Sequence, residues 1–524
     1  MGLAFGSIAP RRTAAVCAGL LAIAFTALLW IASSAKASEV IYWDNYDTNP
    51  DSVSFANIDG SGGGALNLTG ATEFQSPEGM AYDSVTNRLF VANSGGPQGQ
   101  ITFINLDGSG AGSFHASGAP VEGPEGVTID PATRTIYWIN AEPTPETISW
   151  ARLDGTAGGT LSTTGATLNG PIRLAIDPVG GKVYWGNNVS SSASVSFANV
   201  NNSGGGNLSL AGATPPEAIE GIAVDPAGGR VYWLDNNAEK VSFASLGGGG
   251  GGDVNLAGAI FKEPYGMALD PSVGRLYWGN YNQGSAEGTG AIGFAGIGGG
   301  GAGINIATAP VKGPQDPVVL KSPSGTGAPA VTRSATSRSS LSCSTGGWAA
   351  DYPGSFVYQA PRSFAYQWTR NGTPITGATA TTFNATSAGA YVCTVTATNQ
   401  IGSTAQASAA VKVKSAKVKL TTKKKVNVKP GGVAKFKLKG VNQGDIQSKK
   451  ARVCVKLPKS AKGVLKAPKC ATLGKLKGRG KHGATVKIKV GKSAVGSYKV
   501  SFSVHGSAGT SANAKILVVA PKKK

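Results

Sequence analysis

Histidine is scarce in this chain: His115, His482 and His505 are the three among 524 residues. Only His115 falls in the first half of the chain, in a stretch expected to form an outermost strand, where a histidine is more often a surface residue than a general base. The sequence also lacks a G-x-S-x-G elbow, a His-x-x-x-His pair and a Walker loop. These absences argue against a histidine-based catalytic centre.

Cysteine is almost as scarce, with five residues in the whole chain. One of them, Cys17, lies in an apolar leader. The other four are an even number in a chain that we expect to be exported, which favours disulfides. Their positions predict one bridge in each of two later domains, Cys343 with Cys393 and Cys454 with Cys470.

Long apolar runs are absent except at the start. Arg11 and Arg12 precede an apolar run over residues 14–31, and Ala35-Lys36-Ala37 offers small residues for cleavage. This pattern predicts a signal peptide over residues 1–37 and a secreted or cell-envelope protein. An uncleaved membrane anchor is the alternative, because the run is nearly long enough to span a bilayer.

Acidic residues are nearly missing from the C-terminal part. Residues 411–524 contain 31 lysines and arginines and one acid, Asp445, whereas residues 38–320 contain 10 basic and 26 acidic residues. The overall charge of +21 therefore describes neither part. Such an asymmetry predicts an acidic head and a basic tail with different partners.

A Tyr-Trp pair recurs through the acidic part at a nearly fixed interval. The first residues of the pairs, with Phe90-Val91 as a weaker copy, lie at 42, 90, 137, 184, 232 and 277, so that the steps are 48, 47, 47, 48 and 45. A period of this size indicates an array of supersecondary units or a propeller. Around each pair the sequence predicts four short strands, which is the content of a propeller blade.

The strands of the repeats can be placed from the pattern. First strands are predicted at 77–83, 124–130, 171–177, 219–225 and 264–270, and short fourth strands at 65–68, 207–210 and 253–256. Glycine tracts such as 247–252 are expected to be flexible turns. A spare strand at 314–320 is expected to complete the first blade and so to leave no open sheet edge. Residues 38–320 are therefore predicted to form a six-bladed β-propeller.

The repeat resembles a known family. Its pattern, P-x-G-h-A-h-D-P followed by R/K-h-Y-W-x-N/D, is similar to the YWTD repeats of low-density-lipoprotein-receptor class B propellers, which are TolB-like in fold. The resemblance implies a structural role, bridging neighbouring blades, for the fourth motif position. This position is occupied by Asn45, Asn93, Asn140, Asn187, Asp235 and Asn280. Lipoprotein or endocytic function is not carried over, because fold does not imply function.

The candidate site lies on the face where first strands begin and second strands end. Loops with Asn45-Tyr46-Asp47, Asn187-Asn188, Asn236-Asn237 and Tyr281-Asn282 are expected to surround it. The opposite face, with its Asp-Pro and Gly-Ser turns, is expected to be poor in chemistry. The candidate ligand-binding residues are Glu78, Glu125, Arg173, Glu220, Tyr265, Gln315, Asn188, Asn236 and Tyr281.

Three of these residues are candidates for a metal site. Glu78, Glu125 and Glu220 would supply the oxygen ligands that Ca²⁺ prefers, as in gluconolactonase-like propellers. The alternative is that these acids only cap turns, and no compact ligand motif such as an EF-hand loop is present. We expect a protein without a cofactor that binds a protein or glycan; a metal-dependent hydrolase or lactonase is the second hypothesis.

Two further domains are expected after a Pro/Ser/Gly linker at 321–335. Residues 336–414 contain Cys343, Trp368 and Tyr391 two positions before Cys393, the immunoglobulin pattern. They resemble bacterial Ig-like domains, with Ser387 in place of the usual aspartate.

Residues 415–520 alternate lysine and apolar residues, as in Lys435-Phe436-Lys437-Leu438-Lys439, which predicts a second Ig-like β-sandwich with lysine on its outer face. A basic tail follows at 521–524. The lysine face is expected to attract an anionic cell-wall polymer or membrane surface. Nucleic acid is not an expected partner, because Phe436, Tyr498 and Phe502 are the only aromatic residues in this domain.

Overall fold

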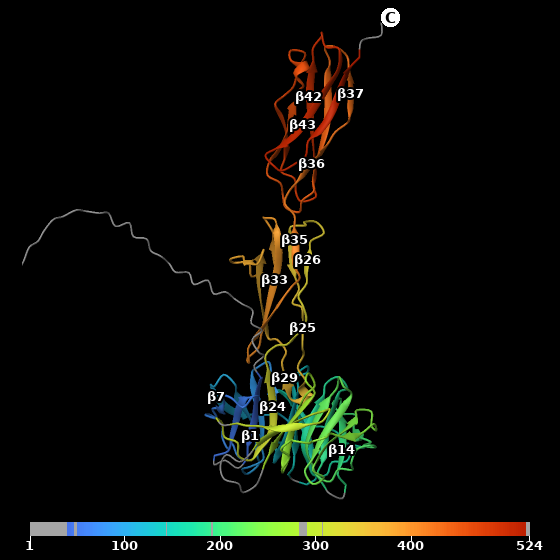
Figure 1. The fold of residues 1–524 in the computed structure, drawn as a ribbon. Helices are drawn as coiled ribbons and strands as arrows, with labels where there is room; N and C mark the ends of the chain where they lie inside the picture. The colour runs from blue at the N-terminus through green and yellow to red at the C-terminus, as the bar shows by residue number, and fades with distance from the viewer. Residues whose placement is uncertain are drawn as a thin grey trace, which may run out of the picture.

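The computed structural model describes residues 39–46, 50–142, 144–189, 192–281, 291–306 and 308–519. The expected signal peptide at 1–37 and basic tail at 521–524 lie outside them, as do Asp47 and Asn282. The described chain is built of strands, and it holds no helix that is both long and apolar enough to cross a membrane. It is arranged as three parts placed end to end (Figure 1).

The first part consists of six antiparallel sheets within the described residues. The innermost strands are β4 (Pro77–Asp83), β8 (Pro124–Asp130), β12 (Pro171–Asp177), β16 (Ile219–Asp225), β20 (Pro264–Asp270) and β24 (Pro314–Lys321). Beside them lie β5 (Arg88–Asn93), β9 (Thr135–Asn140), β13 (Lys182–Asn187), β17 (Arg230–Asp235), β21 (Arg275–Asn280) and β1 (Glu39–Asn45). The third strands are β6 (Gln100–Asn105), β10 (Thr147–Arg152), β14 (Ser194–Asn199), β18 (Lys240–Ser245), β22 (Ala291–Gly296) and β2 (Ser52–Asn57). The outermost are β7 (Gly110–Phe114), β11 (Gly158–Thr160), β15 (Gly205–Asn207), β19 (Gly252–Asp253), β23 (Gly301–Ile304) and β3 (Gly64–Ala65).

The six innermost strands form a closed ring. Each contacts the next in chain order from β4 to β24, and β24 in turn contacts β4. The last strand also pairs with the first, Val40 lying opposite Leu320, so the predicted completion of the first sheet is confirmed. The first part is therefore a β-propeller, in which ring closure protects the sheet edges.

The Tyr-Trp pairs build the core of the propeller. The five tryptophans of the pairs are completely buried. In the third sheet, Trp138 Nε1 donates to the Pro120 carbonyl at 3.0 Å, and Asn140 Oδ1 accepts from the Glu122 backbone N–H at 3.0 Å. These two hydrogen bonds hold the segment that arrives from the preceding sheet, with Pro120 and Glu122, against β9. The structural role implied for Asn140 is confirmed by these bonds.

The outermost strands lie earlier than the sequence predicts. β15 and β19 end at Asn207 and Asp253, where strands were expected to begin. The residues that follow, Leu208 and Val254, are buried and start the connection to the next sheet. Glycine occupies the strand instead, because a Cβ on Gly252 would meet the Phe243 ring at 2.9 Å. The prediction that these glycines are only flexible turns is therefore wrong for Gly252.

The second part is a pair of sheets joined by a disulfide. One sheet has the order β26-β27-β32 and the other β31-β30-β33-β34, with β35 also on β33. The predicted bridge between Cys343 and Cys393 is confirmed, and Trp368 is buried beside it. The elements are β25 (Gly325–Gly327), β26 (Val331–Arg333), β27 (Ser340–Cys343), β28 (Gly347–Trp348), η1 (Pro353–Ser355), β29 (Val357–Tyr358), β30 (Ser363–Arg370), β31 (Thr373–Pro374), β32 (Thr382–Asn384), β33 (Gly389–Thr398), β34 (Ser403–Ala407) and β35 (Val411–Val413).

Residues 321–335, for which the sequence predicts a linker, contain two of these strands. β25 pairs with β28 and β26 with β27, so this stretch is held by strand pairing at both ends. Its small residues leave room for close contacts: Gly325 lies directly against the Gln406 side chain.

The third part is a two-sheet sandwich with its own core. The sheet orders are β36-β38-β42-β40 and β37-β44-β43-β39-β41. The predicted Cys454–Cys470 bridge is confirmed. Asp445 joins this part to the second, because its buried carboxylate contacts Arg333 at 3.1 Å and Arg338 at 3.4 Å. The elements are β36 (Val418–Thr421), β37 (Lys425–Val428), β38 (Val433–Asn442), β39 (Ala451–Lys456), η2 (Lys459–Ala461), β40 (Leu465–Lys466), β41 (Cys470–Gly474), β42 (Lys481–Val490), β43 (Gly496–His505) and β44 (Ala512–Val518).

Candidate functional site

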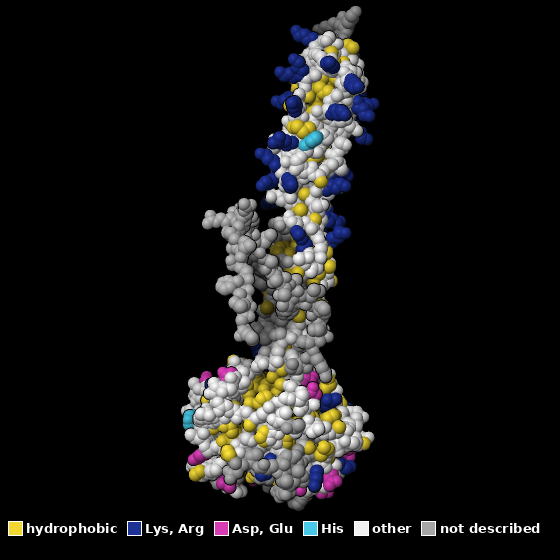
Figure 2. All heavy atoms as spheres, turned by 60° about the vertical axis from the view of Figure 1, so that its left-hand side comes forward, with side chains coloured by type: hydrophobic (Ala, Val, Ile, Leu, Met, Phe, Trp, Pro, Cys, Tyr) yellow, Lys and Arg dark blue, Asp and Glu magenta, His cyan; other side chains and the backbone are white. Residues whose placement is uncertain are grey.

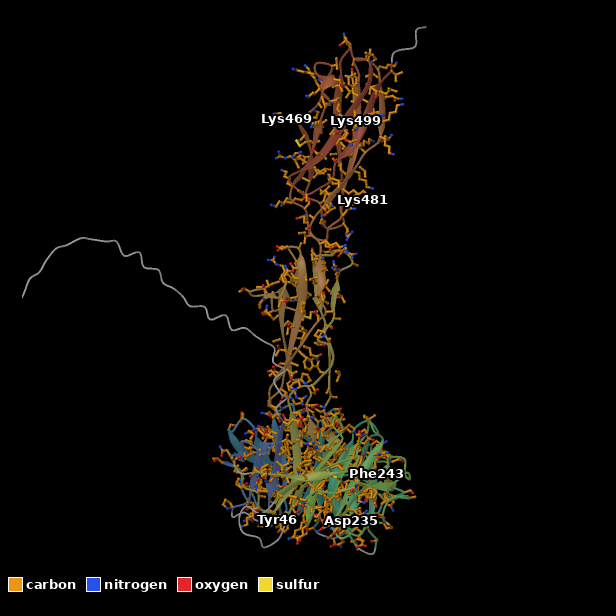
Figure 3. The ribbon with its side chains drawn as sticks, viewed as in Figure 1. Tyr46, Asp235, Phe243, Lys469, Lys481 and Lys499 are labelled. Atoms are coloured by element: carbon orange, nitrogen blue, oxygen red, sulfur yellow. A yellow bond between two sulfur atoms is a disulfide. The ribbon has the colours of Figure 1, made fainter. Side chains whose placement is uncertain are left out.

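The predicted site residues lie around one end of the propeller channel. Pairing of Pro77 with Asn93 and of Pro124 with Asn140 puts the starts of innermost strands beside the ends of their neighbours. Tyr46 and Asp235, at the ends of two such neighbours, lie on the propeller side that faces away from the rest of the chain (Figure 3). We call this end of the channel the mouth.

Arg173 is the centre of the polar residues at the mouth. The residue is buried, and its Nε donates to Asp316 Oδ1 at 2.7 Å. One terminal nitrogen donates to Gln315 Oε1 at 2.6 Å, and the other contacts Glu78 Oε2 at 3.3 Å. Strands β12, β24 and β4 thus supply one cross-linked group across the channel, and the predicted residues Glu78, Arg173 and Gln315 are brought together.

Asp316 is a functional candidate that the sequence analysis missed. It occupies the third position of its strand, where four other innermost strands carry glycine. Glycine is needed there because neighbouring backbones approach closely: a Cβ on Gly79 would lie 2.8 Å from the Gly126 Cα. The two strands without glycine carry Arg173 and Asp316, which pair. A comparison of this position across the repeats would have found the pair.

Asp44 is the second residue that was missed as a site candidate. It is completely buried, and neither of its carboxylate oxygens has a hydrogen-bond partner. Oδ2 of Asp316 and Oε2 of Glu220 are also buried without a partner. Burial raises the pKa of Asp44 well above its usual range, and the Asp316 carboxylate adds to the rise. Among the described residues, the mouth therefore holds more buried carboxylates than the Arg173 guanidinium pairs with.

Two of the predicted glutamates have pKa values near neutrality. Burial, together with the neighbouring Glu78 carboxylate, raises the pKa of Glu125 to about 8. Burial also raises the pKa of Glu220 to about 7, although Arg173 acts in the opposite direction. At neutral pH the mouth thus carries carboxyl groups that are partly protonated and act as both donors and acceptors.

Tyrosines also lie at the mouth. The Tyr281 ring packs edge-on against Tyr46 at 5.9 Å and against Tyr265 at 5.4 Å between centroids. Asn188 donates to Glu220 Oε1 at 2.7 Å, which places it in the polar group. The backbone N–H of Asn236 donates to the Ala218 carbonyl, so this residue shapes its turn.

Two of the three candidate metal ligands have polar partners at the mouth. Among the described residues, no group of three or more His, Cys, Asp or Glu side chains is arranged to hold a metal ion. Glu78 contacts Arg173, and Glu220 accepts from Asn188. The Arg173 guanidinium places a positive charge beside Glu78.

The opposite end of the channel is closed by the second part of the chain. Residues 352–358 fold over the innermost strands, with η1 against β8, β12 and β16 and β29 paired in parallel with β24. Ser355 Oγ donates to the Val224 carbonyl at 2.5 Å. Phe356 lines a cavity of about 10 Å³ together with Arg173 and Asp316, which is close to the least volume that one water needs. We call residues 352–358 the plug.

The raised pKa values predict how the stability of the propeller depends on pH. A carboxyl whose pKa is higher in the folded than in the unfolded protein binds more protons when folded, so stability falls as pH rises between the two values. For Glu125 this window runs from 4.5 to about 8. We expect the melting temperature to fall between about pH 5 and about pH 8, and to fall less in E125Q. E142Q, which changes an exposed glutamate, is the control; equal slopes in all three proteins would contradict the expectation.

Comparison with known proteins gives similarity at the level of fold. No protein-family model and no curated protein matches the chain. Similar solved structures include a nidogen/laminin complex, with 14% identity, a TM-score of 0.42, and coverage of 54% of this chain and 98% of that one. A putative TolB from Agrobacterium tumefaciens has 11% identity and a TM-score of 0.36, covering 54% of this chain and 97% of that one. A Lactobacillus plantarum protein has 15% identity and a TM-score of 0.39, covering 54% and 99%. All three TM-scores are below 0.5, so the propeller rests on the strand pairing described above, and the likeness says nothing about the ligand.

Proposed function

We propose that this is a secreted or cell-surface binding protein whose propeller mouth takes a protein or carbohydrate ligand and whose third part retains it on an anionic envelope. The separation of charge along the molecule carries the proposal. Acidic side chains appear on the propeller, whereas lysine and arginine side chains follow the third part along its length (Figure 2). The one acid of that part, Asp445, is buried and paired with arginines.

The lysines of the third part are arranged at a cost in stability. Lys435 and Lys487 lie directly opposite each other on adjacent strands, as do Lys466 and Lys489. Like charges in such positions repel each other and destabilise a sheet. The alternating burial of β38 and β42 keeps the lysine chains in solvent, where a polyanion would relieve the repulsion.

The finer architecture belongs to the same proposal. We take the six sheets as the blades of a six-bladed propeller and the second and third parts as Ig-like domains. The inter-sheet disulfide, the buried Trp368, and the Tyr391 hydroxyl that donates to the Ser387 carbonyl at 2.7 Å support this for the second part. Together they act as a stalk that holds the mouth away from the surface.

The hydrolase hypothesis has less support at the mouth. A metal-dependent lactonase needs carboxylates free to hold the ion, whereas Glu78 contacts Arg173 and Glu220 accepts from Asn188. Tyrosines beside partly protonated carboxyls suit the recognition of a ligand with hydroxyl or amide groups.

Retention on an isolated cell envelope tests the proposed function. We expect the full chain to bind envelope preparations at about 0.05 M salt and to be released at about 0.5 M, because screening weakens attraction between exposed charges. The variant K435Q/K437Q/K487Q should bind more weakly at low salt. Binding that does not respond to salt or to this variant would overturn the electrostatic account.

A further inference from the structure

Three exposed valines gather at the tip of the third part, the end farthest from the propeller. Val433, Val495 and Val519 are 42%, 76% and 44% exposed, and they are the large hydrophobic residues exposed in the described residues of this part. They begin β38, precede β43 and follow β44. An apolar side chain in water is common when isolated, but three that share one end are a surface feature.

Backbone contacts bring these three segments together. Val519 N–H donates to the Val428 carbonyl at 2.9 Å, and Gly496 pairs with Val518. Gly431 N–H donates to the Gly491 carbonyl at 3.1 Å, which joins the loop before Val433 to the loop before Val495. Figure 1 shows this end, where β44 leads into the C-terminus, as the far end of the elongated molecule.

Lysines lie at the same tip as the valines. Lys429 and Lys492 come from the two loops just described, and both are exposed. Lys459 begins η2 and Lys462 follows it. Two residues further on, the Val464 carbonyl accepts a bond from Gly491 N–H at 2.7 Å. Asp445 lies at the opposite end of the sandwich, against the second part. The tip thus carries exposed valines and exposed lysines together.

We propose that this tip docks on the surface of an anionic phospholipid bilayer, with the valines entering the headgroup boundary and the four lysines contacting lipid phosphates. The inference rests on the proposed function and names the envelope component concerned. Basic residues around exposed apolar side chains are the pattern of interfacial membrane binding. A linear anionic polymer bound along the lysine face of β38 and β42 would not contact the valines. A planar membrane surface would contact the far end of the elongated molecule, where the valines lie.

Vesicle binding by the full chain tests this proposal. We expect co-sedimentation with vesicles of phosphatidylglycerol and phosphatidylcholine and none with phosphatidylcholine alone. The variant V433S/V495S/V519S should bind at least about tenfold more weakly, because each change removes apolar area that the membrane would bury. V85S/V179S/V273S is the matched control, since these propeller valines are 67%, 89% and 59% exposed. In V495W, brominated lipid should quench the added tryptophan.

The outcomes distinguish insertion of the tip valines into the bilayer from electrostatic attraction by the lysines alone. If the valine variant binds vesicles as tightly as the parent chain, or if V495W is not quenched, the tip does not enter the bilayer and the proposal is overturned. Binding to envelope but not to vesicles also overturns it and points to a wall polymer, while leaving the proposed function intact. Loss of binding to both would overturn the proposed function itself.

Discussion

Replacing Arg173 with methionine is expected to destabilise the propeller by about 3–5 kcal/mol at neutral pH. The guanidinium is buried and contacts Asp316, Gln315 and Glu78. Methionine fills a similar volume but leaves the carboxylates without a counter-charge, and removing one partner of a buried pair costs more than the pair contributes. Gln315 Oε1 would lose its donor as well.

The pH dependence of this loss distinguishes charge from packing. Without Arg173, which now opposes the rise, the pKa values of Asp316 and Glu78 should move further upward. The folded variant then binds more protons than the unfolded chain over a wider window, so its stability falls more steeply as pH rises. The deficit relative to the parent chain should be smaller at about pH 5 than at about pH 8. Thermal unfolding followed by the fluorescence of the buried propeller tryptophans measures it.

Two further variants control this experiment. R173K keeps the charge but loses the fork of donors, and an intermediate stability is expected. R173M/D316N removes one of the unpaired carboxylates and should recover part of the loss. A deficit that is the same at both pH values, with no recovery in the double variant, would mean that Arg173 acts through packing alone.

Sequence periodicity predicted the propeller strands well because each repeat states the same pattern again. The bounds predicted for β4, β8, β12, β16 and β20 are those observed. The exceptions within the repeat were also informative, since Arg173 and Asp316 replace a glycine that close backbone approach otherwise requires. Asp316 was missed because acidic candidates were taken from the second position of each innermost strand, and the third positions of the repeats were not compared.

Sequence periodicity could not predict the plug. Residues 352–358 carry neither alternation nor a helical pattern, and their burial depends on a partner more than a hundred residues earlier, as the Ser355–Val224 bond shows. Buried Ser355 and Gln359 look like loop residues when the sequence is considered alone. The opposite face was predicted to be poor in chemistry, and the group that docks there comes from another part of the chain.

Replacing Gly354 with valine is expected to expel the plug from the channel. Gly354 is buried, and an added Cβ would overlap the Ile176 carbonyl oxygen and lie 3.4 Å from the Val224 Cβ. Neither backbone can yield, because both strands belong to the closed ring. The plug would then lose the Tyr82–Tyr358 ring contact, with centroids 5.0 Å apart, and the pairing of β29 with β24.

The propeller should stay folded in G354V, because its ring closes through β24 and β1 without the plug. Hydrogen exchange should rise in residues 352–358 and in the ends of β12 and β16, and proteases should cut between Asp351 and Ala360. G298V is the matched control, since a Cβ on Gly298 meets nothing within 4 Å. Protection of the plug equal to that of the parent chain would contradict the expectation.

Expelling the plug should also change the environment of the mouth, because Arg173 and Asp316 line the cavity that Phe356 of the plug also lines. Phe356 now closes the cavity of about 10 Å³ that these two side chains line. Once water enters from the plug side, burial raises the pKa of Asp316 less, and the carboxyls of the channel move toward their usual values. The fall in propeller stability between about pH 5 and about pH 8 should therefore be shallower in G354V than in the parent chain. An unchanged slope, with the plug shown to be out by hydrogen exchange, would mean that the mouth alone sets the environment of these acids.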